Sequence, residues 1–173
     1  MASPRTRPEP ASIPPQMLAL MVKGVSVIVS AAGLDLHPSL MRAMGSAVAP
    51  DGSCITVYLS RSQSVQLLQD ISSTRRLAVV FTQPHSHQAL QLKGTLLEIR
   101  PAEPSDLQAL DHYRASMVQE LSLIGYGPEY AHAMFRCAIE DLAAVRFTPL
   151  QAFDQTPGPH AGTALSGARS TGS

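Results

Sequence analysis

The sequence predicts an α+β domain that is mainly β, with a six-stranded antiparallel sheet closed into a barrel and flanked by helices. Six runs of alternating or β-branched residues are typical of strands, and most of the connections between them are short. Helical spacing occurs in only three segments. Short connections favour antiparallel pairing, and closure into a barrel removes the exposed edges of a sheet.

Each expected strand has its own signal. Val25, Val27 and Val29 alternate with serines in the first strand, which ends at Gly33. The turn residues 50–53 join the second strand to the third in a hairpin. The six expected strands cover residues 25–33, 40–48, 54–59, 77–82, 89–99 and 142–147.

The helical segments differ in strength. A short one covers residues 64–71, and another covers 129–138. The clearest helix begins at Ser105, where Ser105 and Gln108 are expected to form a capping box. Its apolar residues recur at helical spacing over 107–124, which predicts a stripe that packs against other elements.

Residues 16–154 are expected to form the one folded domain. Residues 1–15 contain prolines at five positions, and residues 155–173 are nearly all small or polar. Both ends are therefore expected to be disordered.

Composition excludes several classes of function and location. The formal net charge is zero, which excludes generalised attraction to nucleic acid or to an anionic membrane. No apolar run approaches the ~18 residues that span a bilayer. Cys54 and Cys137 are far apart in a chain too large to need disulfides. We therefore expect a cytoplasmic protein of bacterial type.

The stretch 59–65 is the strongest candidate for a binding site. A strand ends and a helix begins there, so unpaired backbone N–H groups and the helix dipole attract an anion. Ser60, Ser62, Ser64 and Arg61 crowd the same turn. These groups predict a phosphate-binding site, because guanidinium groups and helix N-termini both bind phosphate oxygens. A plain helix N-cap beside a solvated Arg61 is the alternative.

Two basic residues stand inside expected strands. Arg42 shares a strand face with apolar residues, where a charge needs a partner. That partner is either an acid such as Glu98 or Asp35, or a bound phosphate. Lys93 either reaches solvent or contacts a ligand.

No catalytic motif is present. The chain contains no nucleophile elbow, phosphate-binding Walker loop or His-Glu-x-x-His motif. His85 and His87 have no acidic or cysteine neighbour in the sequence, so no metal site is predicted. The sequence identifies no catalytic residue.

Over about residues 16–160 the chain resembles the pyridoxamine 5'-phosphate oxidase-like, FMN-binding split-barrel proteins. The resemblance rests on the order of the strands and on four short motifs, Met41–Gly45, Ser60–Gln63, Leu90–Gly94 and Val145–Leu150. It implies a six-stranded split barrel that dimerises, with one FMN in each of two clefts between the subunits.

The resemblance also implies a set of cofactor contacts. Arg42 and Arg61 match arginines that contact the FMN phosphate, and Thr56 matches a residue at the flavin edge. The full set is Arg42, Thr56, Ser60, Arg61, Ser62, Gln63, Gln91 and Lys93. Ser62 and Ala47 replace lysines of the family, and the chain has no tryptophan, so oxidation of pyridoxamine phosphate is not expected.

The expected function is that of an FMN-binding flavoprotein, an oxidoreductase or flavin reductase acting on a small molecule. FAD, a deazaflavin and haem are the alternative cofactors. A haem-binding or haem-degrading split barrel and a non-catalytic flavin-binding module are the alternative functions. A homodimer is expected because a small barrel fills with its own side chains, so a flavin must lie outside it under a second subunit. The alternative is a monomer whose helical stripe packs on its own barrel.

Overall fold

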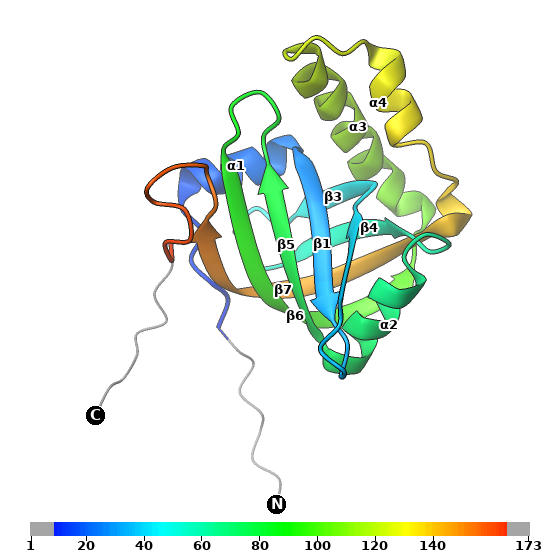
Figure 1. The fold of residues 1–173 in the computed structure, drawn as a ribbon. Coiled ribbons are helices and arrows are strands. Elements are labelled where there is room, and N and C mark those ends of the chain that lie inside the picture. The colour runs from blue at the N-terminus through cyan, green and yellow to red at the C-terminus, as the bar shows by residue number, and fades with distance from the viewer. Residues whose placement is uncertain (1–8, 166–173) are drawn as a thin grey trace, which may run out of the picture.

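Seven antiparallel strands form one sheet in the order β2-β1-β5-β6-β7-β4-β3 (Figure 1). The computed structural model describes residues 9–165. The strands are β1 (Ser26–Ala32), β2 (Pro38–Arg42), β3 (Gly45–Val48), β4 (Ile55–Ser60), β5 (Arg76–Thr82), β6 (Ala89–Pro101) and β7 (Leu142–Asp154). The predicted α+β class, mainly β, is confirmed.

The seventh strand arises because the strand expected over 40–48 is bent in two. Before the bend the chain pairs with β1, and after it the chain pairs with β4. At the bend, the Ala43 N–H donates to Val27 O of β1 at 2.9 Å and the Met44 N–H donates to Tyr58 O of β4 at 2.7 Å. One continuous segment therefore joins the two edges of the sheet and closes the barrel.

The last strand is longer than expected. The strand signal stops before Pro149, but β7 continues to Asp154. Pro149 lies at an irregularity in the β6–β7 pairing, where a missing backbone N–H is tolerated.

The helices are α1 (Pro15–Lys23), α2 (Val65–Thr74), α3 (Leu107–Ser122) and α4 (Pro128–Met134), with short 3-10 turns at Pro104–Asp106 and Ile139–Asp141. The capping box expected from Ser105 and Gln108 is wrong. Asp106 instead accepts the Glu103 N–H at 2.8 Å, and it also pairs with Arg100. These bonds from Arg100, the Glu103 N–H and Tyr58 hold the pKa of Asp106 at about 2, despite its burial.

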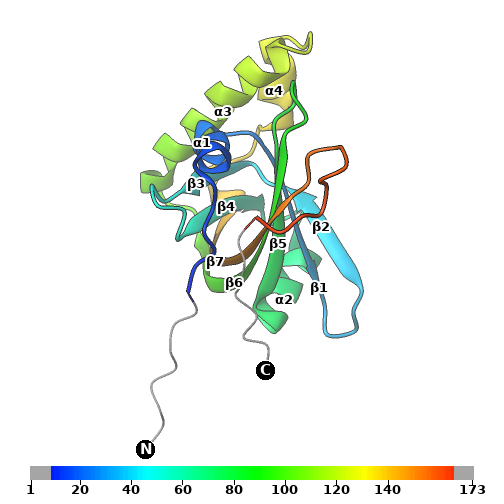
Figure 2. The same cartoon turned by 90° about the vertical axis from the view of Figure 1, so that its left-hand side faces the viewer.

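The helices cover the barrel at its ends. Helix α2 packs against β1 and β2, whereas α3 packs against β3 and α4 (Figures 1 and 2). Helix α3 lies so close to β3 that a Cβ on Gly45 would come within 2.8 Å of Leu110. Three members of the apolar stripe on α3, Leu110, Met117 and Leu121, are buried. The stripe is thus mostly covered by the chain itself.

The core is filled by apolar side chains from the strands. Those with no exposed surface include Val27, Val57, Val79, Phe81, Leu92, Val145 and Phe147. A ligand must therefore bind on the outer surface. Within the described residues, no helix has both the length and the apolar character needed to cross a membrane.

The ends of the described chain lie along β7. The Ala11 N–H donates to Pro149 O, and the Leu165 N–H donates to Ala152 O, both at 2.8 Å. The described parts of the two expected terminal segments are residues 9–15 and 155–165, and α1 begins at Pro15. The rest of these segments, 1–8 and 166–173, lies outside the described residues.

Candidate functional site

The junction between β4 and α2 holds an anion, but it is the carboxylate of Asp141. This carboxylate accepts hydrogen bonds from the Ser60 hydroxyl at 2.6 Å, the Ser62 N–H at 2.9 Å and the Ser62 hydroxyl at 2.8 Å. The Arg61 N–H donates to the Asp141 backbone oxygen at 2.6 Å. The hydrogen bonds from Ser60 and Ser62 hold the pKa of Asp141 below its usual range.

The donors expected to bind phosphate at Ser60 and Ser62 therefore already have a partner within the chain. Sequence reasoning missed Asp141, which lies 81 residues beyond Ser60 and belongs to no motif there. Other polar groups at the junction are less engaged. The Gln63 N–H makes a 3.3 Å contact with the Ser60 hydroxyl, and the buried Ser64 hydroxyl has no hydrogen-bond partner among the described residues.

Arg42 lies at the end of β2 without an acidic partner in the described part of the chain. Its Nη1 lies 2.8 Å from the sulfur of Met134. The two acids considered from the sequence bind elsewhere: Asp35 pairs with His37 at 2.9 Å, and Glu98 pairs with an arginine of β7 at 2.7 Å. Neither Asp35 nor Glu98 therefore forms an ion pair with Arg42.

Arg42 and Arg61 lie at the same end of the β3–β4 pair. Gly45 at the start of β3 pairs with Tyr58 of β4. Arg42 lies three residues before Gly45, and Arg61 lies three residues after Tyr58. The Arg61 side chain is exposed and forms no salt bridge with a described residue. Two guanidinium groups without carboxylate partners therefore stand at one end of the barrel.

Gln91 and Lys93 lie on a different part of the surface, along the outer face of β6. Lys93 borders a groove of about 840 Å³ over β1, β5, β6 and β7, and its Nζ lies 5.1 Å from the centre of the Phe153 ring. The Gln91 side chain accepts a hydrogen bond from Gln155 at 3.4 Å.

The eight residues expected to contact a cofactor thus form two groups, with Thr56 between them. Ser60 is opposite Leu142 on β7, and Lys93 is opposite Gln151 on the same strand. Nine residues of strand separate these positions, about 30 Å. One group, which we call the junction group, contains Arg42, Ser60, Arg61, Ser62 and Gln63. The other, Gln91 and Lys93, lies beside the groove. Thr56 is opposite Arg146, four residues before Ser60 on β4.

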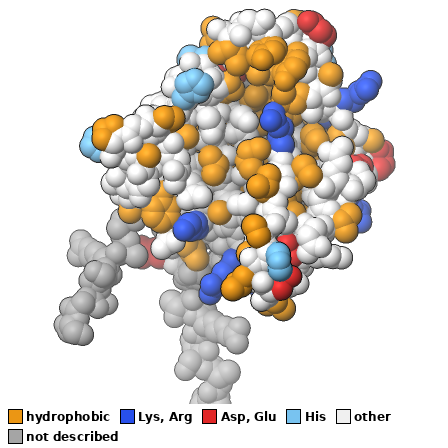
Figure 3. Space-filling model, viewed as in Figure 1, with side chains coloured by type: hydrophobic (Ala, Val, Ile, Leu, Met, Phe, Trp, Pro, Cys, Tyr) orange, Lys and Arg blue, Asp and Glu red, His pale blue; other side chains and the backbone are white. Residues whose placement is uncertain are grey.

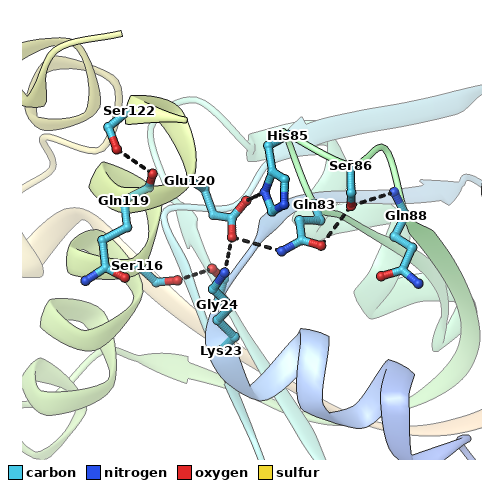
Figure 4. Close-up of polar contacts among 10 residues, drawn as sticks. All are labelled: Lys23, Gly24, Gln83, His85, Ser86, Gln88, Ser116, Gln119, Glu120 and Ser122. Atoms are coloured by element: carbon cyan, nitrogen blue, oxygen red, sulfur yellow. Dashed lines mark hydrogen bonds and ion pairs between the residues drawn. The ribbon is translucent and has the colours of Figure 1, made fainter. Parts of the chain in front are cut away.

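A third polar cluster, also missed by the sequence, surrounds Glu120 of α3 (Figure 4). Its fully buried carboxylate pairs with Lys23 of α1 and accepts hydrogen bonds from Gln83 at 3.0 Å and His85 at 2.7 Å. Burial raises the pKa of Glu120, but the bonds from Lys23, Gln83 and His85 outweigh burial and hold it below its usual value. The cluster ties α1 and the β5–β6 turn to α3.

The fold has counterparts among solved structures. No family model matches the sequence, and no curated protein matches it. The chain is similar to an F420 reductase, with a TM-score of 0.55 and 15% identity over 81% of this chain and 98% of that one. It is also similar to a candidate pyridoxamine 5'-phosphate oxidase from Lactobacillus delbrueckii, with a TM-score of 0.53 and 13% identity over 82% of this chain and 93% of that one.

A third similar structure is HupZ from Group A Streptococcus, with a TM-score of 0.53 and 13% identity over 87% of this chain and 99% of that one. At such identities the likeness concerns the fold alone. The chain therefore has the split-barrel fold of the pyridoxamine 5'-phosphate oxidase-like proteins, as the resemblance in sequence implied.

Proposed function

We propose that the protein is an FMN-binding flavoprotein that acts as an oxidoreductase or flavin reductase on a small molecule. The observation that carries this proposal is the pair of guanidinium groups of Arg42 and Arg61 at one end of the β3–β4 pair, neither of which has an acidic partner among residues 9–165. Guanidinium is the side-chain group best suited to bind phosphate oxygens, because it offers a planar fork of donors. The similar fold of an F420 reductase agrees with a flavin-type cofactor.

The residues of the junction fit a phosphate beside Asp141 rather than in its place. Asp141 occupies the N–H and hydroxyl of Ser62, so we assign the phosphate to Arg42 and Arg61. The buried Ser64 hydroxyl, which has no described partner, is a further candidate donor. Thr56 lies half-buried on β4, and we assign it to the edge of the flavin. The bound flavin would supply hydride transfer, which no side chain can perform.

We further propose a homodimer in which both groups of residues serve one cofactor. About 30 Å of strand separates them within a chain, so a twofold partner is the simplest way to bring Gln91 and Lys93 to a flavin held at the junction. The β1–β2 hairpin projects from the barrel (Figure 2). Its Leu34 and Leu36 side chains are 83% and 82% exposed. Such exposure of leucines supports a contact with another subunit.

A cytoplasmic location is part of the proposal. Cys54 and Cys137 are both free thiols, as expected in a reducing compartment.

The test of the flavin proposal compares two ligands that differ only in the phosphate. Arg42→Ala and Arg61→Ala are each expected to weaken FMN binding about ten- to a hundredfold, since a charge-assisted hydrogen bond contributes about 1.5–3 kcal/mol. Riboflavin, which lacks the phosphate, should bind all variants equally. Arg75→Ala, at an exposed arginine that follows the C-terminal end of α2 and lies away from the junction, is the control.

If both variants bind FMN as tightly as the parent, the phosphate assignment is wrong. Parallel titrations with FAD, a deazaflavin and haemin identify the cofactor, because the absorption spectrum of each complex differs. Preference for haemin over every flavin would overturn the proposal in favour of the haem alternative.

A further inference from the structure

A thioether, that of Met134 at the end of α4, contacts Arg42 at the proposed phosphate site. Its sulfur lies 2.8 Å from Arg42 Nη1 and accepts a hydrogen bond from that guanidinium. A guanidinium carries several N–H donors, and a thioether is only a weak acceptor, so the contact leaves donors of Arg42 for a ligand. A stronger acceptor at the same position would compete with that ligand.

The packing of its neighbours fixes the end of α4 at this place. Phe135 is fully buried and meets the ring of Tyr113 on α3 edge-on, with 5.4 Å between the ring centres. Its N–H donates to the backbone oxygen of buried Ala131 at 3.0 Å. Met134 therefore stays beside Arg42, because α4 cannot move away without exposing Phe135 to water.

Met134 is also within reach of small solutes. It is half-buried at the edge of the core, and hydrophobic side chains gather on the surface of the α3–α4 hairpin that carries it (Figure 3). Four other methionines are at most 7% exposed: Met17, Met21, Met44 and Met117. A dissolved oxidant therefore reaches Met134 before it reaches these four.

Oxidation of Met134 changes the acceptor that faces Arg42. A lone pair of the thioether sulfur attacks one oxygen of hydrogen peroxide, the O–O bond breaks, and the released hydroxide takes the remaining proton and leaves as water. Sulfur gives up an electron pair, and the peroxide is reduced. The resulting sulfoxide is polar, and its oxygen accepts hydrogen bonds more strongly than sulfur does.

We propose that Met134 is an oxidation site that regulates the phosphate site. Peroxide converts Met134 to the sulfoxide, whose oxygen holds the Arg42 guanidinium and lowers the affinity for FMN. The effect on FMN rests on the proposed function, because it requires that Arg42 bind the phosphate. The oxidation site itself rests on the exposure of Met134 and on its contact with Arg42.

The test treats the full chain with hydrogen peroxide, removes the peroxide, and measures FMN and riboflavin binding by fluorescence titration. FMN should bind about tenfold more weakly after treatment, which corresponds to one charge-assisted hydrogen bond, whereas riboflavin should bind equally before and after. Met134→Leu should not respond to peroxide. This variant retains Cys54 and Cys137, so an effect of thiol oxidation would persist in it. Met41→Leu, which replaces another half-buried methionine, should respond as the parent does.

A second variant imitates the sulfoxide without an oxidant. Met134→Gln places an amide oxygen near the position of the sulfur, and untreated it should bind FMN about tenfold more weakly than Met134→Leu. Equal binding of riboflavin by the two variants shows that both are folded. Mass spectrometry of peptides from the treated parent should find oxygen on Met134 before it appears on the four buried methionines.

Unchanged FMN affinity in a parent that carries the sulfoxide at Met134 would overturn the proposal. An equal response to peroxide in Met134→Leu, or earlier oxidation of the buried methionines, would overturn it as well. Failure of the proposed function looks different: the untreated parent does not bind FMN, or untreated Arg42→Ala binds FMN as the parent does. The regulation then falls with that function, while the mass spectrum still decides whether Met134 is the oxidation site.

Discussion

The Glu120 cluster allows the sharpest test of how this fold is held together. Lys23→Met removes the ammonium partner of a fully buried carboxylate and leaves it with hydrogen bonds from Gln83 and His85 alone. A hydrogen bond to a charged group contributes about 1.5–3 kcal/mol. Because the Lys23 side chain is 42% exposed, screening by solvent places the loss near the lower end, about 1.5 kcal/mol.

Glu120→Gln is expected to cost more, about 3 kcal/mol. All three donors lose their charged acceptor, and the new amide group turns a donor toward Lys23 or His85. In a chain of this length 1 kcal/mol corresponds to about 2–4 °C in Tm. The melting temperature should therefore fall by about 3–6 °C for Lys23→Met and by about 6–12 °C for Glu120→Gln.

The stabilisation should depend on pH in a defined direction. The pKa of Glu120 in the folded chain lies below its ordinary value of 4.5, so the unfolded chain binds the proton more readily. The contribution is present above that ordinary value and is lost as the pH falls through the folded pKa. The difference in unfolding free energy between parent and Glu120→Gln should therefore shrink as the solution is acidified.

Urea denaturation followed by circular dichroism measures these free energies, with Gln119→Ala as the control on an exposed position of the same helix. If Lys23→Met and Glu120→Gln both stay within about 0.5 kcal/mol of the parent at neutral pH, the cluster does not hold α1 and the β5–β6 turn to α3. A difference in unfolding free energy between parent and Glu120→Gln that grows on acidification would contradict the assigned direction of the pKa shift of Glu120.

Two further predictions concern the proposed site and assembly. Asp141→Asn removes a negative charge beside the proposed phosphate position. It should tighten FMN binding roughly fivefold, because about 1 kcal/mol of Coulomb repulsion is lost. Weaker FMN binding in a titration would show that Asp141 positions the junction instead. Light scattering at micromolar concentration should report twice the 18.4 kDa of one chain, and Leu34→Asp with Leu36→Asp should shift the mass toward a single chain. A parent of single-chain mass with flavin bound would end the dimer proposal.

Local signals in the sequence predicted most of the elements of this fold. The alternation of Val25, Val27 and Val29 marks β1, and the turn residues 50–53 mark the β3–β4 hairpin. These features depend on neighbours within a few residues, which is why they are visible without the structure. The mid-strand charge of Arg42 was likewise visible as a residue in need of a partner.

Contacts between distant segments were decided by the tertiary structure alone. Nothing in residues 40–48 shows that the chain changes partner at Ala43 and Met44, because that bend depends on where β1 and β4 lie. Asp141 reaches the junction from 81 residues beyond Ser60, and Glu120 meets Lys23 across 97 residues. Met134 meets Arg42 across 92 residues.

The division has one physical reason. The sequence by itself determined which segments form strands and helices, and which residues carry charge where a partner is needed, because periodicity and turn chemistry act locally. The tertiary structure decided which partner each group receives: an internal carboxylate for the Ser60–Ser62 donors, and a thioether but no described acid for Arg42. Those outcomes depend on barrel closure and strand register, which bring together residues that no local pattern connects.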